Sequence, residues 1–498
     1  MDASRGPGEV GRRADQTDLS GYDTTPAYLS RRTSRRGLFV FLGTGVAAAS
    51  LAAAAGGRST DSALRHPPDP EGLLLDGVAE AAEQPGNWSV VKADSGRRFI
   101  KDSSVLIPTE PDPTASPAIP AADMDTAPAV LAARAWLAAG TIPGPGALRD
   151  LATRALLDLR LALQTDGALP AGPITIWELV WPRDACWAAA ALAVTGHPDD
   201  AARILRFLAR VQLGDGTWAA RTLVNGSGRT PDARPPQLDA VGWFPWAAWL
   251  WHRAQSAAAQ TRPGRTAAAK ALPDDLWHAV RAAANAAVRA LGTDGLPEPS
   301  GDYWEVLPAA TTVGNAAILR AGLRAAAELG ELTGDARSAA AWSRSAGWLG
   351  QAITLRFGPN GYRRTPDGET VDAAVTWLAP PFAPPDQAVQ DAVAHAALVL
   401  TVPNGGIVPG VPGPGTQGEA WTPETAFFAL CDASSGAVDL AEARLAWLSG
   451  HRTGLGSLPE RVGPSGNPIS VAPLAWTNAV VLLALSALDR PLPIPGQS

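Results

Sequence analysis

Apolar residues recur at helical spacing along most of the chain, from about residue 126 to residue 488. Loops rich in glycine, proline and aspartate separate these segments, and strand-like patterns are few and confined to the long loops. The pattern therefore predicts an all-α main body. We expect helices over residues 126–138, 146–164, 184–195, 198–212, 238–258, 273–291, 311–329, 335–355, 370–379, 385–400, 423–433, 436–449 and 473–488.

The loops between the predicted helices alternate in kind. Some are short and plain, whereas others are long and carry aromatic and charged residues. The long loops enter their helices at intervals of about 60 residues, near positions 181, 237, 304, 370, 421 and 476. Six helical hairpins of this length predict a closed (α/α)6 toroid, with the helix over 126–138 flanking the ring. The long loops that carry aromatic and charged residues, here called decorated loops, would all meet on one face of it. An open helical solenoid with a concave face is the alternative.

The segments on either side of the main body have a different composition. Residues 58–122 contain several proline clusters and have the pattern of a linker with a small irregular extension. Short strands are expected at 88–91 and 99–107, too little for an independent sheet domain, so this extension is expected to pack on the helical body. We place the helical domain at 123–490 and a tail at 491–498.

The N-terminal 57 residues have the features of an export signal. Residues 34–40 have the sequence Ser-Arg-Arg-Gly-Leu-Phe-Val, which resembles the twin-arginine signal. A weakly apolar run over 38–55 comes next, and small residues at 52–57 offer a cleavage zone. These features predict a secreted or extracytoplasmic protein. An uncleaved membrane anchor is the alternative, because 18 apolar residues are just long enough to span a bilayer.

Net charge limits the partners. The formal net charge is −7 and the isoelectric point is about 5.5, which argues against nucleic acid and anionic membranes. We expect no membrane contact beyond the signal segment, and a monomer. Six scattered histidines, with no Cys-x-x-Cys and no His-x-x-x-His pattern, give no reason to expect a metal or another cofactor.

The chain has eighteen tryptophans against four tyrosines and nine phenylalanines. Side chains of this size are expected to line a core or an apolar cleft. Trp243, Trp246 and Trp249 form one stripe on a predicted helix, which favours a place in the core or ring wall over a binding platform. The two cysteines, Cys186 and Cys431, form either one bridge or two buried thiols.

Residues 301–306 hold two carboxylates and two aromatic side chains in six positions, before a long alanine-rich helical pattern. A carboxylate packed between aromatic rings loses solvation, which raises its pKa and lets it hold a proton near neutral pH. Glu305, beside Tyr303 and Trp304, is therefore a candidate general acid. In the alternative interpretation the aromatic residues belong to the core and Glu305 is a solvated first-turn acid.

Other loops of the same kind carry further polar groups. Arg183 and Asp184 come directly after Trp181, and adjacent donor and acceptor side chains can bind vicinal hydroxyls; Asp184 can instead cap a helix. Glu424 is either a pocket residue or a first-turn acid. Glu460 comes after Pro459, in what is ordinarily a solvated turn.

Four motifs in order carry a resemblance to a known family. They are Trp-Pro-Arg-Asp at 181–184, Asp-Tyr-Trp-Glu at 302–305, Leu-Pro-Glu at 458–460 and Pro-Leu-Ala-Trp-Thr-Asn-Ala at 473–479. Over roughly residues 125–490 the chain resembles the glucoamylase family of glycoside hydrolases, family 15. The resemblance implies an (α/α)6 barrel and inverting hydrolysis of an α-glucosidic bond at the non-reducing end of an oligo- or polysaccharide.

The resemblance also implies roles for single residues. Glu305 would be the general acid and Glu460 the general base, while Arg183 and Asp184 would hold the hydroxyls of the terminal sugar. The walls and lining of the pocket would come from Trp181, Trp304 and Trp476, with Asp302 and Glu424 beside them.

Inversion needs one protonated and one ionised carboxyl group, about 6.5–9.5 Å apart, on opposite sides of the sugar. Glu305 and Glu460 come from the third and sixth hairpins, which face each other in a six-membered ring. Glu460 would be kept ionised by Arg461, which stands where the family often has glutamine. A catalytically inactive sugar-binding toroid, or another toroid enzyme such as a phosphorylase or a lyase, is the alternative.

Overall fold

The computed structural model describes residues 75–84, 86–92, 96–107, 124–260, 272–412 and 418–497. The predicted export signal and most of the proline-rich linker lie outside these ranges. Within them, no helix is both long enough and apolar enough to cross a membrane.

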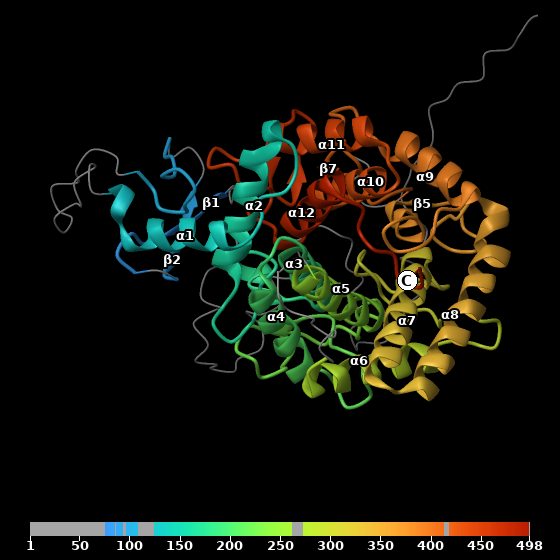
Figure 1. The fold of residues 1–498 in the computed structure, drawn as a ribbon. Coiled ribbons are helices and arrows are strands. Elements are labelled where there is room, and N and C mark those ends of the chain that lie inside the picture. The colour runs from blue at the N-terminus through green and yellow to red at the C-terminus, as the bar shows by residue number, and fades with distance from the viewer. Residues whose placement is uncertain are drawn as a thin grey trace, which may run out of the picture. The chain divides into compact units, whose positions relative to one another are not determined.

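Six helical segments form an inner ring, seen nearly end-on in Figure 1. Each packs against the next, and the last packs against the first, so the ring is closed and the solenoid alternative is wrong. In ring order the segments are α3 (Pro182–Val194), α5 (Ala240–Gln260), α7 (Val313–Thr333), the 3₁₀-helix η6 (Ala373–Leu378), α10 (Thr422–Ser434) and α12 (Ala475–Asp489).

An outer layer of helices covers the inner ring, and each outer helix packs mainly against one inner segment. Five of them come after their inner partner in the chain. The sixth outer position is filled by α2, which precedes the ring in sequence and packs on α12, so the closing hairpin joins the two ends of the domain. The outer helices are α4 (Pro198–Arg210), α6 (Asp274–Arg289), α8 (Ala336–Phe357), α9 (Gln387–Leu400), α11 (Val438–Gly450) and α2 (Arg149–Ala162).

Helix α1 (Pro128–Ala139) flanks the ring, as the sequence predicts. Its Trp136 stacks on His197 with ring centroids 3.6 Å apart, and the indole Nε1 donates to Asp200 Oδ2 at 2.7 Å. The remaining one-turn 3₁₀ segments are η2 (Met124–Thr126), η3 (Gly146–Leu148), η4 (Thr175–Trp177) and η5 (Gly358–Asn360).

Two predicted elements differ from the structure. The helix expected over 370–379 is instead a short strand and then the six residues of η6, because Val371 and Asp372 pair with Val411 and Gly410 of a distant loop. The strand expected over 99–107 reduces to one bridge between Phe99 and Leu106 around a turn. The other predicted helices agree with the structure to within a few residues at each end.

The inner and outer helices differ in their burial. Every residue of α3 is buried, as is expected for a helix that is alanine-rich and apolar on all sides. In α4, by contrast, Ile204 and Leu208 are buried while Arg206 and Arg210 lie toward solvent. This difference places the inner ring in the core of the domain.

Aromatic side chains fill the inside of the ring. Trp187, Trp243, Trp377, Phe382 and Phe427 are buried and in mutual contact, with ring centroids 4.8–5.9 Å apart for the contacting pairs. The tryptophan stripe on α5 therefore belongs to the core, as its spacing predicts. Both cysteines are buried free thiols, which decides between the two alternatives left open by the sequence.

Helices α5 and α7 cross at two glycines. A Cβ atom on Gly322 would lie 2.4 Å from the backbone oxygen of Gly242, and one on Gly242 would lie 2.5 Å from the oxygen of Ile318. Backbone atoms cannot move aside cheaply in a closed ring. The crossing therefore requires that both positions lack a side chain.

Gly322→Ala is expected to lower the free energy of unfolding by about 1–3 kcal/mol, because the added methyl group forces two helix backbones apart. Urea unfolding measures the change. Gly347→Ala on α8 is the matched control, since a Cβ atom there meets nothing and the better helix former should add up to about 1 kcal/mol. Equal effects of the two substitutions would contradict this account of the crossing.

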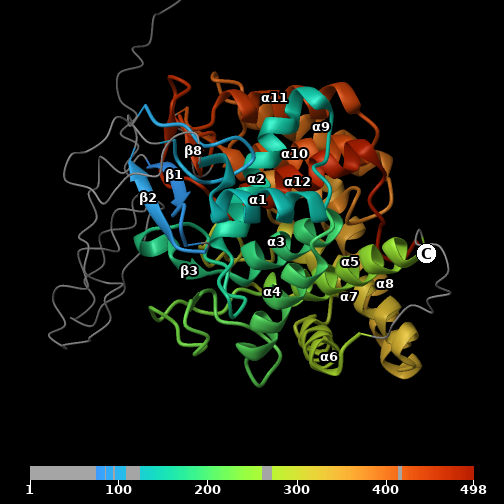
Figure 2. The same cartoon turned by 60° about the vertical axis from the view of Figure 1, so that its left-hand side comes forward.

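The N-terminal extension packs on the helical domain, as predicted. Strands β1 (Leu75–Glu80) and β2 (Trp88–Lys92) pair antiparallel, and Glu80 accepts from Arg160 of α2 at 3.0 Å. Thr453 Oγ1 donates to the backbone oxygen of Asp76, and Leu455 N donates to its carboxylate at 3.3 Å. In Figure 2 the hairpin lies beside α1, α2 and strand β8 (Arg461–Val462). It therefore supports the loop that leads to Glu460.

Candidate active site

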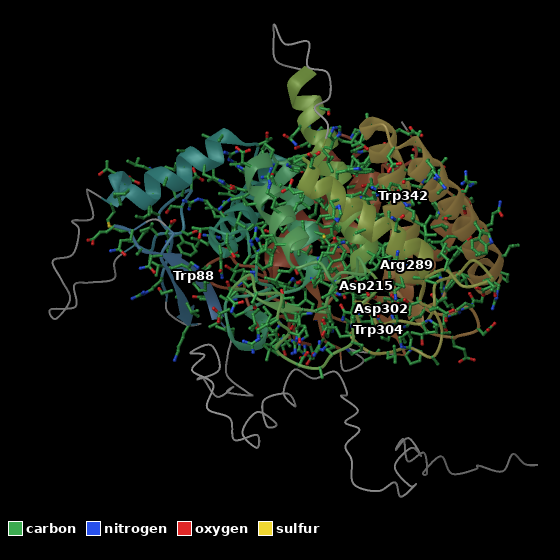
Figure 3. All side chains as sticks on the ribbon, turned by 90° about the horizontal axis from the view of Figure 1, so that it is seen from below. Trp88, Asp215, Arg289, Asp302, Trp304 and Trp342 are labelled. Carbon is green, nitrogen blue, oxygen red and sulfur yellow. The ribbon has the colours of Figure 1, made fainter. Side chains whose placement is uncertain are left out.

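Three small sheets hold together the loops that precede the inner helices. The first pairs β3 (Leu179–Val180) with β4 (Thr222–Leu223), and the second pairs β5 (Val371–Asp372) with β6 (Gly410–Val411). In the third, β8 lies between β7 (Ala420–Trp421) and β9 (Pro468–Ile469). Several of the loops that enter the inner helices are thus fixed to one another at the same end of the ring. Figure 3 shows Asp302 and Trp304 together among these loops.

Glu305 lies in the loop before α7 with a φ of 59°, a left-handed conformation that is uncommon for a residue with a side chain. Its carboxylate accepts from Trp181 Nε1 at 2.5 Å and forms an ion pair with Arg234. Arg183 Nη2 lies 3.7 Å away, and the side chain is 26% exposed. Two guanidinium groups and one indole N–H therefore face the Glu305 carboxylate.

Glu460 lies just before β8, in the connection that leads to α12. Its carboxylate accepts from Trp177 Nε1 at 3.3 Å and from Ser470 Oγ at 2.5 Å, and it is 18% exposed. Ser470 itself has a φ of 70°. Arg461 Nε lies 3.7 Å away, although its Nη1 bonds Glu419 at 2.7 Å. Trp177 and Ser470 thus hold the Glu460 carboxylate in place.

Arg183 and Asp184 connect the surroundings of the two glutamates. Arg183 is buried over the ring of Trp476, 4.6 Å from its centroid, and donates to Asp239 at 3.2 Å while also contacting Glu305. Burial raises the pKa of Asp184 to about 6, and the charge of Glu460 contributes in the same direction. Asp184 does not cap its helix, because the N-cap residue is Trp181. Glu305 and Glu460 therefore border one cluster of charged side chains, whose centre is formed by Arg183, Asp184 and Asp239.

Glu424 is a buried acid near Glu460 whose pKa lies above its usual range. It lies in the first turn of α10, is buried, and its Oε2 makes no hydrogen bond within the described residues. Burial raises its pKa to about 8, with Glu460 and Asp372 adding repulsion. Glu424 is therefore protonated at neutral pH, and it is a first-turn acid of α10 that is buried.

Glu424→Gln is expected to stabilise the protein more at pH 8 than at pH 5. The folded protein holds a proton up to about pH 8 that the unfolded chain releases near its ordinary pKa of 4.5, so the free energy of unfolding falls across this window. Glutamine removes that loss, which is on the order of a few kcal/mol. Urea unfolding at both pH values tests this, with the exposed Glu331→Gln as control; equal gains at pH 5 and pH 8 would contradict it.

Asp302 lies in the turn that leads to Glu305. It is fully buried and accepts from Arg364 Nη2 at 2.8 Å and from the backbone N–H of Trp304 at 3.0 Å. Arg364 also bonds Asp372 at 2.5 Å and stacks on Trp304 at 3.8 Å. Asp302 positions the turn that ends in Glu305. The backbone N–H of Glu305 donates to the backbone oxygen of Asp302 at 2.8 Å.

The predicted aromatic walls lie close to the charged residues. Trp181 donates to Glu305, Trp476 lies under Arg183, and Trp304 is partly buried against Arg364. Sequence reasoning did not identify several further contacts, which come from Trp177, Ser470, Arg234, Arg364 and Asp372. Trp177 lies four residues before Trp181, a spacing that offered a signal; Arg234 belongs to no recognisable pattern.

No group of three or more histidine, cysteine, aspartate or glutamate side chains in the described part of the chain is placed to hold a metal ion. The carboxyl, guanidinium and indole groups of the cluster offer proton transfer and hydrogen bonding.

The fold is shared with solved structures of carbohydrate-active proteins. A glycosidase superposes with a TM-score of 0.58 at 18% identity, covering 68% of this chain and 96% of that one. A bacterial glucoamylase complexed with acarbose gives 0.58 at 18% identity, covering 74% and 59%, and the glucoamylase from Saccharomycopsis fibuligera gives 0.55 at 13%, covering 66% and 90%. No protein-family model and no curated protein matches the sequence. At these identities the likeness shows the (α/α)6 fold.

Proposed function

We propose that this chain is an exported, inverting glycoside hydrolase of the glucoamylase type, which cleaves an α-glycosidic bond at the non-reducing end of an oligo- or polysaccharide. One observation carries the proposal. Two partly exposed carboxylates, Glu305 and Glu460, border the buried Arg183–Asp184 pair from different loops of one ring end. The fold shared with a glycosidase and two glucoamylases supports the same class.

The proposed reaction uses one proton donor and one proton acceptor. Glu305, once protonated, gives its proton to the glycosidic oxygen as the bond from that oxygen to the anomeric carbon breaks. Water attacks the opposite face of the anomeric carbon, and Glu460 accepts the proton that this water loses. The product sugar has the inverted anomeric configuration, and both proton transfers use side chains of this chain alone.

The remaining residues would bind the terminal sugar. Asp184 Oδ2 makes no hydrogen bond among the described residues, so it can accept one from a sugar hydroxyl. Protonated Glu424 has both a donor and a free acceptor oxygen close to Glu460. The rings of Trp181 and Trp476 are buried beside these groups and would contact the apolar faces of the sugar.

The test is a panel of starch oligomers, isomaltose-type oligomers, trehalose and other α-glycosides, with the first-formed product anomer followed by NMR. Release of a β-sugar from an α-glycoside is the expected result. Release of an α-sugar would contradict inversion. Binding of a sugar without turnover would favour the inactive sugar-binding alternative. In that alternative the ion pair with Arg234 would keep Glu305 from acting as a general acid.

Export is part of the proposal and rests on residues 34–57 alone. Lysines in place of Arg35 and Arg36 are expected to keep the protein inside the producing cell. N-terminal sequencing of the secreted protein locates the cleavage, and sedimentation of the mature chain tests the proposed monomer.

A further inference from the structure

Arg234 contacts the carboxylate of Glu305, the proposed general acid. It lies in the loop between α4 and α5 and forms an ion pair with Glu305. In the same loop Asp232 pairs with Arg221 and lies 3.9 Å from Arg234 Nε. Arg221 in turn stacks over Trp181, 5.0 Å from the ring centroid, and Trp181 donates to Glu305. A general acid contacts the glycosidic oxygen, so these groups border the leaving-group side of the cluster.

The charges of this group balance only while Glu305 is ionised. Arg221 and Arg234 then face Asp232 and Glu305, whereas Arg183 has its own partners in Asp184 and Asp239. A general acid must start the reaction protonated, and with Glu305 protonated Arg221 and Arg234 share the single carboxylate of Asp232. Arg234 is 29% exposed and Arg221 is buried, so solvent compensates the second positive charge incompletely.

We propose that the leaving group of the natural substrate carries a carboxylate, and that Arg234 moves from Glu305 to this carboxylate when the substrate binds. The inference rests on the proposed glycosidase function. Arg234 already holds one carboxylate, that of Glu305, so the fork of its guanidinium accepts this group. Once Arg234 is transferred, Glu305 takes up a proton from solvent and passes it to the glycosidic oxygen as the bond to the anomeric carbon breaks.

The test compares two α-glucosides of equal shape, those of lactate and of lactamide, or the same pair with whichever sugar the substrate panel selects. We expect the wild-type protein to favour the carboxylate by about 10–100-fold in kcat/KM, the range for a hydrogen bond to a charged group. Arg234→Met is expected to remove this preference, so that the kcat/KM values of the two substrates become equal. For the amide the alkaline limb of the pH profile should also move to higher pH, since Glu305 loses a cation.

Arg229→Met is the matched control, because it removes the same charge from an exposed position of the same loop. It should leave the preference intact. Equal kcat/KM values for the two substrates in the wild-type protein, or an equal loss on both in Arg234→Met, would overturn the inference. Turnover of the amide with no preference for the carboxylate leaves the proposed hydrolase in place, whereas no turnover of any α-glycoside contradicts the hydrolase itself.

Discussion

Glu460→Gln is expected to slow sugar release by about 10²–10⁴-fold, because an amide cannot accept the proton of the attacking water. Folding should change little. Glutamine has the same shape, and its carbonyl oxygen can still accept from Trp177 Nε1 or Ser470 Oγ. Initial rates on the best substrate of the panel measure the effect, and urea unfolding checks the fold. The exposed Glu331→Gln serves as control, and a Glu460→Gln rate within a factor of two of the wild type would contradict the assignment.

Glu305→Gln should lower the same rate by a similar factor, but a second substrate separates the two roles. Fluoride leaves without protonation, so an α-glycosyl fluoride bypasses a general acid and still needs a general base. Glu305→Gln is therefore expected to hydrolyse the fluoride at close to the wild-type rate, while Glu460→Gln does not. Identical behaviour of the two variants on the fluoride would contradict the division of labour.

Arg364→Leu is expected to lower the free energy of unfolding by about 3–5 kcal/mol, because it leaves two buried carboxylates without their cation. Asp302 and Asp372 are fully buried, and Arg364 bonds both of them. Tyr303 Oη donates to Asp372 at 2.5 Å but supplies no charge. Urea unfolding at pH 7 measures the loss.

The neighbouring Arg363→Leu provides the control, since Arg363 bonds the backbone oxygen of Glu369 and no buried acid. Its effect should stay within about 0.5 kcal/mol. Adding Asp372→Asn to Arg364→Leu removes one of the two buried charges and should restore part of the stability. A single variant as stable as the wild type, or no recovery in the double variant, would contradict the proposed balance of charges.

The fold could be predicted from the sequence because its elements are local and repeated. Helical periodicity locates the helices, and the alternation of plain and decorated loops indicates six hairpins, so the ring can be inferred before any distance is known. The error at 370–379 has a non-local cause, since Val371 and Asp372 pair with a loop that comes about 40 residues later in the chain. The closing partner of α12 was not predictable in this way, since α2 lies more than 300 residues earlier in the chain.

The site was predictable only in part. Motif positions place Glu305, Glu460, Arg183 and Asp184 at one ring end, where the structure also has them. The burial of Asp302 was missed because it depends on Arg364, whose position no local pattern predicts. The same holds for Arg234, which reaches Glu305 from a separate loop. Long basic side chains pair across the tertiary structure, so short sequence windows reveal neither partner.

The closing hairpin of the ring has a consequence for how the protein is made. Helix α12 packs between α3 and α10 and is also the inner partner of α2. The inner ring therefore lacks one of its six segments until residues 475–489 have left the ribosome. A nascent chain released before that point would expose the apolar sides of α3 and α10 that α12 normally covers, and it would be prone to aggregate. Messages truncated upstream of codon 475 should therefore yield insoluble product. The ring should close in one late step, when the last inner helix is added, and not by gradual growth.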